Sequence, residues 1–142
     1  MGTELNASPP RTAILEAVLY AADLDAAERF YDRLLGAVPF AKVEGRHIFY
    51  KLQGQMLLIF NPNATRKPPD GPFPVPPHGA EGDGHVCFAA NADELQRWRV
   101  HLKAMGVAIE SEFEWPSGGH SVYIRDPAGN SVEFAEPRIW GF

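Results

Sequence analysis

Hydrophobic and polar residues follow one order of patterns in the first half of the chain. An apolar run from about Ile14 to Tyr20 predicts a strand. The next stretch, "DLDAAERFYDRLLG", has helical spacing, with Asp23 suited to cap its start and Gly36 suited to end it. Three short β-like runs follow, "AVPFAKV", "RHIFYKL" and "QMLLIF", and the last two are spaced as a hairpin. The first half therefore predicts one strand, one helix and three strands.

The same order begins again near residue 85. The stretch "HVCFAANADELQRWRVHLKAMG" predicts a strand and then a helix that Asn91 caps and Gly106 ends. Three more strands are expected in "VAIESEFEW", "HSVYIRD" and "NSVEFAE". Such a duplicated pattern predicts an α+β fold of two βαβββ units, about 12–62 and 83–137, whose mixed sheets form a cup. We expect residues 1–142 to form a single domain.

A segment rich in proline and glycine separates the two patterns. Residues 61–84, "NPNATRKPPDGPFPVPPHGAEGDG", are expected to hold neither a helix nor a central strand. The connection proper, 63–82, is longer than most links between elements of one domain. The sequence leaves open whether it is a lid over the cup or a tether between the units.

Composition narrows the class of protein. The net charge of −5 provides no basic surface for phosphates, so we expect no nucleic-acid partner. No apolar run is long enough to cross a membrane, and the start "MGTELNASPPR" lacks the apolar core of a signal peptide. The single cysteine, Cys87, excludes an internal disulfide and suits a reducing compartment, so a cytoplasmic protein is expected.

Strand alternation points to a possible metal site. In each unit the apolar set of a strand should face the helix, which sends Glu16, His85 and Glu133 to the opposite surface. If the two sheets pair edge to edge, these three side chains can converge in the cup, and N and O donors from separate strands suit a divalent ion. The position equivalent to Glu133 in the first unit is Leu58.

The two βαβββ units, the stretch "DLDAAERFYDRLLG" and the ending "VYIRDPAGNSVEF" resemble the vicinal oxygen chelate superfamily. This superfamily includes glyoxalases, extradiol dioxygenases and bleomycin-binding proteins. The resemblance implies that Glu16, His85 and Glu133 are the ligands of a divalent metal ion. Two carboxylates and one imidazole would suit Fe, Mn, Ni, Co or Zn. It also implies that Tyr123 is a catalytic acid or hydrogen-bonding group.

Further candidates surround these residues. His120 lies near Tyr123 in the sequence and is a second catalytic candidate. His47 could reach the cup, but an exposed position at a strand edge is the expectation. The predicted substrate pocket consists of Tyr20, Met56, Leu58, Phe60 and Cys87.

Two hypotheses of different classes follow. The first is a metal-dependent enzyme whose small substrate chelates the ion through vicinal oxygens, with dioxygenase-like chemistry favoured over glyoxalase-like chemistry because Leu58 leaves the site more open. The alternative is a metal-free protein that sequesters a drug-like molecule, as bleomycin-resistance proteins do. A homodimer is expected, because members of this length commonly pair and because the tail "RIWGF" carries apolar side chains that need a cover.

Overall fold

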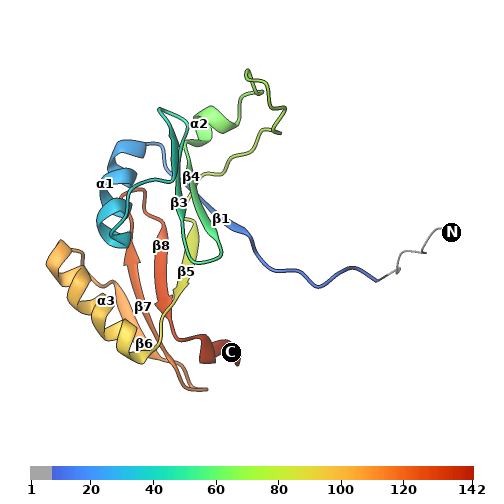
Figure 1. Ribbon diagram of the computed structural model, residues 1–142. Coiled ribbons are helices and arrows are strands. Elements are labelled where there is room, and N and C mark those ends of the chain that lie inside the picture. Colours follow the sequence, from blue (N-terminus) through green and yellow to red (C-terminus); the bar gives the residue numbers. More distant parts are fainter. Residues whose placement is uncertain (1–7) are drawn as a thin grey trace.

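The computed structural model describes residues 8–142, with the elements in the predicted order (Figure 1). The first unit contains β1 (Glu16–Tyr20), α1 (Leu24–Leu35), β2 (Ala41–Val43), β3 (His47–Lys51) and β4 (Met56–Phe60). The second contains β5 (His85–Ala89), α3 (Ala92–Met105), β6 (Ser111–Glu114), β7 (His120–Arg125) and β8 (Ser131–Ala135). A short helix α2 (Pro62–Thr65) follows β4, and a 3-10 helix η1 (Pro137–Trp140) follows β8.

Both long helices begin and end where their capping residues predict. The Asp23 carboxylate accepts a hydrogen bond from the Ala26 amide at the start of α1. Asn91 and Glu94 form a reciprocal capping box at the start of α3. Gly36, at φ +61°, ends α1 in the left-handed conformation that glycine adopts without steric cost.

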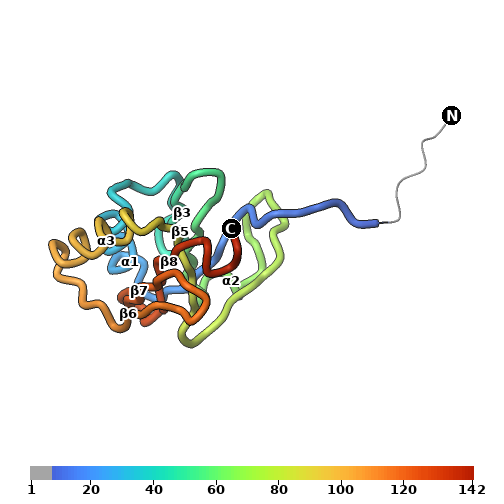
Figure 2. Tube along the Cα trace, turned by 90° about the horizontal axis from the view of Figure 1, so that it is seen from below, coloured from blue at the N-terminus to red at the C-terminus, as the bar shows by residue number. Residues whose placement is uncertain are grey.

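The strands form two four-stranded mixed sheets. Their orders are β1-β4-β3-β2 and β5-β8-β7-β6, and in each sheet the first pair is parallel and the others antiparallel. Helices α1 and α3 lie next to each other against one side of the sheets, which leaves the opposite side without a helical cover (Figures 1 and 2). This arrangement confirms the predicted α+β fold class.

One apolar core lies between the helices and the two sheets. Burial of these side chains is the main favourable term for the fold. Residues from both helices and both sheets contribute to this core, among them Leu19, Tyr31, Leu34, Ile59, Leu95, Leu102, Val122 and Phe134.

A buried carboxylate organises the turn between β7 and β8. Asp126 Oδ2 accepts a 2.7 Å hydrogen bond from the Tyr31 hydroxyl of α1 and a 2.9 Å bond from Asn130 Nδ2. Asp126 Oδ1 accepts from the amides of Ala128 and Asn130, each at 2.9 Å. The turn sequence of the second unit is therefore anchored to the helix of the first.

Asn130 extends this anchor to the strands on either side. Its Nδ2 also donates to the Tyr20 carbonyl at the end of β1 (3.2 Å), and its Oδ1 accepts from the Gly84 amide (2.9 Å) just before β5. A Cβ on Gly84 would lie 2.9 Å from Asn130 Oδ1 and 3.4 Å from Leu19 Cδ2, so glycine is needed for this close approach. The end of β1 is thereby fixed next to the start of β5.

The connecting segment contains a helix that the sequence pattern did not predict. Pro62 occupies the first turn of α2, where backbone amides have no partner within the helix, so the missing N–H of proline costs no hydrogen bond. The Asn61 side chain caps this turn by accepting from the Asn63 amide. The expectation that no helix forms in this segment was therefore wrong. Farther along, the His78 amide donates to the Thr65 carbonyl at 3.0 Å, and the chain between them protrudes from the body (Figure 1). None of the helices within residues 8–142 is long and apolar enough to cross a membrane.

The anchor at Asp126 generates a test of stability. We expect Tyr31→Phe to lower the free energy of unfolding by about 2 kcal/mol, because it removes a buried hydrogen bond to a charged acceptor. The quantity to measure is the unfolding free energy from urea denaturation at pH 7.

A matched control is Tyr50→Phe, because the Tyr50 hydroxyl also donates to an aspartate, Asp32, at 2.7 Å. This hydrogen bond lies within the first unit and is only partly buried. Its loss should be smaller, since water can rehydrate Asp32. A Tyr31→Phe loss no larger than the Tyr50→Phe loss would contradict the role given to Asp126.

Candidate functional site

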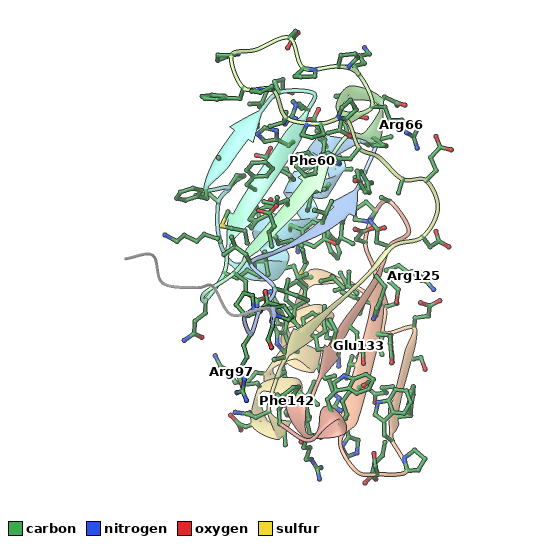
Figure 3. The ribbon with its side chains drawn as sticks, turned by 90° about the vertical axis from the view of Figure 1, so that its right-hand side faces the viewer. Phe60, Arg66, Arg97, Arg125, Glu133 and Phe142 are labelled. Carbon is green, nitrogen blue, oxygen red and sulfur yellow. The ribbon has the colours of Figure 1, made fainter. Side chains whose placement is uncertain are left out.

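The helix-free side of the second sheet carries a cluster of polar and aromatic side chains. His85 and Cys87 of β5 are exposed on this side. Glu133 of the adjacent strand β8 is paired in register with Cys87 on one side and with Tyr123 of β7 on the other. The residue-by-residue alternation of strands thus places these four side chains on the surface where Figure 3 labels Glu133.

His85 and Glu133 are in direct contact. The His85 Nε2 atom lies 3.2 Å from Glu133 Oε1, and the Glu133 side chain is only 8% exposed. The other ring nitrogen, Nδ1, lies 3.0 Å from the Ser131 carbonyl oxygen, which can only accept a hydrogen bond, so Nδ1 carries a proton. A neutral His85 then directs the lone pair of Nε2 toward a carboxylate. A proton on Nε2, or a cation between the two atoms, would make this contact attractive.

Two further side chains fix the second oxygen of Glu133. The Ser121 hydroxyl donates to Glu133 Oε2 at 2.6 Å, and the Trp115 indole Nε1 donates to Ser121 Oγ at 2.8 Å. The indole N–H can only donate, so Ser121 Oγ accepts from Trp115 and its single hydroxyl proton is donated to Glu133. The chain Trp115–Ser121–Glu133 therefore holds the carboxylate in one orientation with Oε1 directed to His85.

The neighbours of Glu133 keep their protons. Burial, together with the negative charge of Glu133, raises the pKa of the Cys87 thiol to about 12, although the residue as a whole is exposed. Burial and the same carboxylate also raise the pKa of Tyr123. The Tyr123 ring lies between His85, at 6.4 Å between ring centroids, and Phe113, at 5.8 Å. The site thus presents a protonated phenol and an unreactive thiol beside the carboxylate.

The third predicted metal ligand lies elsewhere in the chain. Glu16 is exposed at the start of β1, whereas the end of this strand, at Tyr20, lies next to the start of β5. Four residues of strand span roughly 13 Å, so one chain keeps Glu16 apart from His85. Across residues 8–142, no three His, Cys, Asp or Glu side chains are grouped so that they could hold a metal ion. The three-ligand set stays a prediction, and the structure joins two of its members.

The predicted pocket residues are divided between the two sheets. Cys87 lies beside Glu133, whereas the other four, Tyr20, Met56, Leu58 and Phe60, belong to β1 and β4 of the first sheet. In register, Leu58 pairs with Val18 of β1 as Glu133 pairs with Cys87 of β5. The first sheet is therefore apolar at the place where the second carries its carboxylate.

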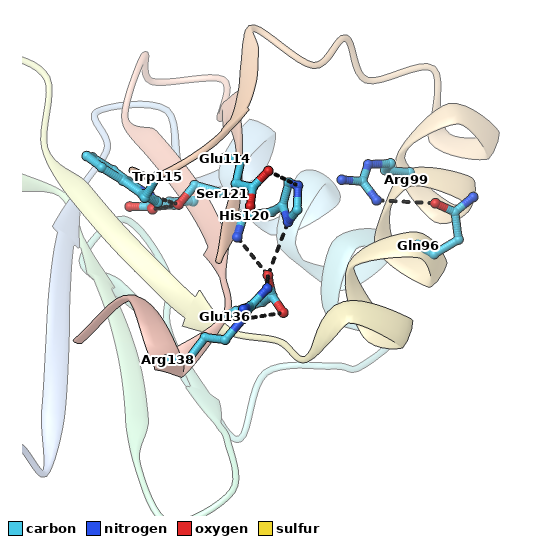
Figure 4. A network of polar contacts seen from close by, with 9 residues as sticks. Gln96, Arg99, Glu114, Trp115, His120, Ser121, Glu136 and Arg138 are labelled. Atoms are coloured by element: carbon cyan, nitrogen blue, oxygen red, sulfur yellow. Dashed lines mark hydrogen bonds and ion pairs between the residues drawn. The ribbon is translucent and has the colours of Figure 1, made fainter. Parts of the chain in front are cut away.

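His120 belongs to a separate polar network at the start of β7 (Figure 4). Glu136 Oε2 accepts from the His120 amide at 2.7 Å and lies 3.3 Å from His120 Nδ1, and Arg138 Nε donates to Glu136 Oε1 at 3.3 Å. Strand alternation puts His120 on the face opposite to Ser121, and Figure 4 shows the two side chains pointing apart. A catalytic role for His120 stays a prediction. Its contacts support a structural role at the start of this strand.

Ser121 and Trp115 are the site residues that sequence reasoning did not identify. Ser121 lies two residues before Tyr123 in β7, so alternation places both on one face of the sheet. That signal was available for Ser121. Trp115 follows the end of β6, where alternation gives no guidance about the direction of its side chain.

Comparison with known proteins identifies the family. Residues 13–134 match the Glyoxalase/Bleomycin resistance protein/Dioxygenase superfamily. The chain therefore belongs to this superfamily, the vicinal oxygen chelate proteins that its motifs resemble. A search of curated proteins found no match.

Solved structures agree with this assignment. A lactoylglutathione lyase from Agrobacterium tumefaciens is 46% identical, with a TM-score of 0.87 over 94% of this chain and 100% of its own. A glyoxalase/bleomycin resistance protein from Catenulispora acidiphila is 22% identical (TM-score 0.64, covering 88% of this chain and 98% of its own). A glyoxalase/bleomycin resistance protein/dioxygenase from Nocardioides is 21% identical (TM-score 0.71, covering 92% and 86%). The last two similarities show the shared fold.

The network around Glu136 generates a prediction on pH. Its hydrogen bond from the His120 amide, and then Arg138, lower the pKa of Glu136. A carboxylate whose pKa is lowered on folding adds stability above its unfolded pKa, and this stability is lost as the pH falls through the folded pKa. Glu136→Gln should therefore reduce the urea midpoint most at pH 7, and the difference from the unmodified protein should shrink below about pH 4.

Glu114→Gln is the control for this effect. Glu114 Oε2 lies 3.8 Å from His120 Nε2, but its side chain is 61% exposed, so the midpoint should barely change at either pH. A Glu136→Gln effect of equal size at pH 7 and pH 3 would contradict the role given to the charge.

Proposed function

We propose that this protein is a metal-dependent enzyme of the vicinal oxygen chelate superfamily, acting on a small substrate that presents two vicinal oxygens. His85 and Glu133 are the proposed ligands on one chain, and Glu16 from a second copy of the chain is the proposed third. The proposal rests on the contact between the Glu133 carboxylate and His85 Nε2. The other ring nitrogen of His85, Nδ1, donates to the Ser131 carbonyl.

The donor set fits a divalent ion. Metal-bound histidines commonly donate their other ring N–H to a backbone carbonyl, as His85 Nδ1 does to the Ser131 carbonyl. With bond lengths of about 2.1 Å, two ligands of one ion lie roughly 3 Å apart, which agrees with the 3.2 Å between His85 Nε2 and Glu133 Oε1. Ser121 and Trp115 support the ligand carboxylate from behind. The candidate metals remain Fe, Mn, Ni, Co and Zn.

A bound divalent ion would act as a Lewis acid toward the two substrate oxygens. The protein's own groups would orient the substrate around it. The phenol of Tyr123, which retains its proton, can donate a hydrogen bond to a substrate oxygen next to Glu133. Phe113 and Tyr123 stack with nearly parallel rings and supply an apolar wall on the same face. Cys87, held as a neutral thiol, takes no part as a nucleophile.

Among the reaction types of the superfamily, we favour lyase or isomerase chemistry for this protein. The sequence favoured dioxygenase-like chemistry because of Leu58, but the 46% identical relative is named a lactoylglutathione lyase. A lactoyl group carries a carbonyl and a hydroxyl oxygen on adjacent carbons, which is the vicinal pair that such a site would bind. Formation or cleavage of lactoylglutathione is therefore the first reaction to assay, with a catechol as the dioxygenase comparison.

A second candidate, metal-free sequestration of a small molecule, is favoured by one observation. The described part of the chain brings only two of the three proposed ligands together. In this alternative, Phe113, Tyr123 and Glu133 would form an acidic and aromatic surface for a cationic drug-like ligand. Metal titration separates the two candidates.

The metal prediction is tested with protein that has been treated with EDTA and then titrated with Zn²⁺ or Ni²⁺. We expect one ion per chain by calorimetry and elemental analysis. His85→Ala and Glu133→Gln should each weaken binding about 100-fold or more, because a site with three protein ligands depends on each of them. His120→Ala, which changes a histidine on the opposite face, should leave the affinity unchanged. Stoichiometric binding that survives Glu133→Gln would eliminate this site.

The assembly prediction tests the contribution of Glu16 in trans. If Glu16 completes the site of a partner chain, the Glu16→Ala and Glu133→Gln proteins should each bind metal poorly on their own. After unfolding and refolding together in equal amounts, about one quarter of the sites should regain full affinity, because half of the dimers are mixed and each mixed dimer has one intact site.

Light scattering provides the control for assembly. A mass near 15.7 kDa at micromolar concentration would show a monomer and reject the shared site. A dimer whose mixture of variants regains no binding would reject the contribution of Glu16 while leaving His85 and Glu133 as ligands.

A further inference from the structure

A cavity lies on the first unit, between the β2–β3 turn and the protruding part of the connecting segment. Its volume is about 510 Å³, within the range of pockets that bind small molecules. The residues around it are mainly apolar with a few charges, and include Arg46, His47, Lys67, Asp70, Phe73 and Val75. No metal ligand proposed above lines this cavity.

The guanidinium of Arg46 is held in place at this cavity. It lies 5.5 Å from the centroid of the Phe60 ring, and its Nη1 donates to His47 Nδ1 at 2.5 Å. His47 is buried and stacks on Phe49 at 4.0 Å between ring centroids. The expectation of an exposed edge histidine was therefore wrong. Arg46 has lost much of its side-chain freedom before any ligand arrives.

The hydrogen-bonding capacity of this pair is only partly used. Burial, and then the charge of Arg46, lower the pKa of His47, so the imidazole is neutral and its Nδ1 serves as the acceptor. The Nε2 atom therefore carries the ring proton. Arg46 has five N–H donors, and within residues 8–142 the bond to His47 is the one that its side chain makes. Free N–H donors on a fixed guanidinium form a receptor for an anion.

The charge around the cavity is positive in an otherwise acidic protein. Within the described residues, neither Arg46 nor Lys67 has a carboxylate within ion-pair distance. By contrast, the neighbouring Arg66, outside the cavity, is paired with Glu81 at 2.8 Å. With Asp70 as the one acidic residue of the lining, the two cations leave a net charge of +1, which matches a ligand with a single negative charge.

The connecting segment provides an apolar wall whose base is fixed. The Tyr20 hydroxyl lies 2.6 Å from His78 Nδ1, and the His78 ring packs edge-on against Phe60 at 4.7 Å. Between this base and α2, Phe73 and Val75 are 75% and 47% exposed, more than apolar side chains in a protein interior. They can bury this surface against the body of a ligand in the cavity.

We propose that this cavity binds a small monocarboxylate with an apolar body, with Arg46 and Lys67 contacting the carboxylate and Phe73 and Val75 contacting the apolar part. A planar guanidinium matches the two oxygens of a carboxylate, and the prolines, Phe73 and Val75 favour an aliphatic or aromatic body over a hydrated phosphate. The connecting segment is then the roof of a binding site. The site is independent of the metal proposal, because it shares no residue with it.

The experiment uses the full-length protein after EDTA treatment, with phenylacetate as the probe and phenylacetamide as its neutral isostere. We expect phenylacetate to bind with a submillimolar Kd by calorimetry and the amide at least tenfold more weakly. In ¹³C-labelled protein, phenylacetate should shift the ring signals of His47 and leave those of His85 unchanged. Equal affinity for the acid and the amide, or a shift at His85 alone, would overturn the proposal.

Variants test the contributions of the two cations and of the connecting segment to phenylacetate binding. Arg46→Gln and Lys67→Gln should each weaken phenylacetate binding about tenfold, whereas Lys51→Gln, at the other end of β3, should have no effect. Because Arg46→Gln can disturb Phe60 and His47, the exposed Lys67→Gln keeps the test valid if the first variant is unstable. Replacing residues 69–75 by a Gly/Ser link, which retains Lys67 and His78, should weaken both the acid and the amide. Unchanged affinity in Lys67→Gln and in the shortened protein would overturn the proposal.

Discussion

The position of the candidate site depends on the buried carboxylate of Asp126. It accepts hydrogen bonds from Tyr31 of α1 and from amides of its own turn. Asn130 of this turn hydrogen-bonds the Tyr20 carbonyl at the end of β1 and the Gly84 amide. Gly84 directly precedes His85, and the turn directly precedes β8. Both residues of the His85–Glu133 pair are therefore aligned from one buried point. A buried charge with this many hydrogen bonds is stable only in one arrangement, which makes the alignment specific.

Glu133 is a second buried carboxylate, and it lies on the side of the sheet that has no helical cover. Burial of a carboxylate is expensive unless its oxygens are paired. Ser121 satisfies one oxygen, with Trp115 fixing the direction of the hydroxyl, and the second oxygen faces a histidine nitrogen that lacks a proton of its own when His85 is neutral. The Cys87 thiol and the Tyr123 phenol also hydrogen-bond this carboxylate. Glu133 is therefore held by side chains from β5 and β7, and its contact with His85 leaves a carboxylate and an imidazole side by side at the surface of the sheet.

The sequence predicted the fold well because its signals are local. Caps at Asp23 and Asn91, glycines at the helix ends and alternating strands each depend on a few neighbouring residues. Strand alternation also predicted that His85 and Glu133 share a face. It could not tell that β1 meets β5 through its end, because the relative placement of two sheets is set by contacts such as Asn130 to Tyr20, which are 110 residues apart. The turn chemistry of Asp126 was visible, whereas its bond to Tyr31 was not.

The two units share one strand order, but the side chains on the helix-free face of their sheets differ in chemistry. In register, Leu58 takes the place of Glu133, Phe49 that of Tyr123, and His47 that of Ser121. Each exchange is physically consistent with the others. Without a carboxylate at 58, the first sheet has no need of a hydroxyl donor at 47, and its aromatic rings can pack on one another instead. The second sheet thereby presents a carboxylate held by a hydroxyl, and the first presents packed aromatic rings at the equivalent positions, so one duplicated framework holds two faces of different chemistry.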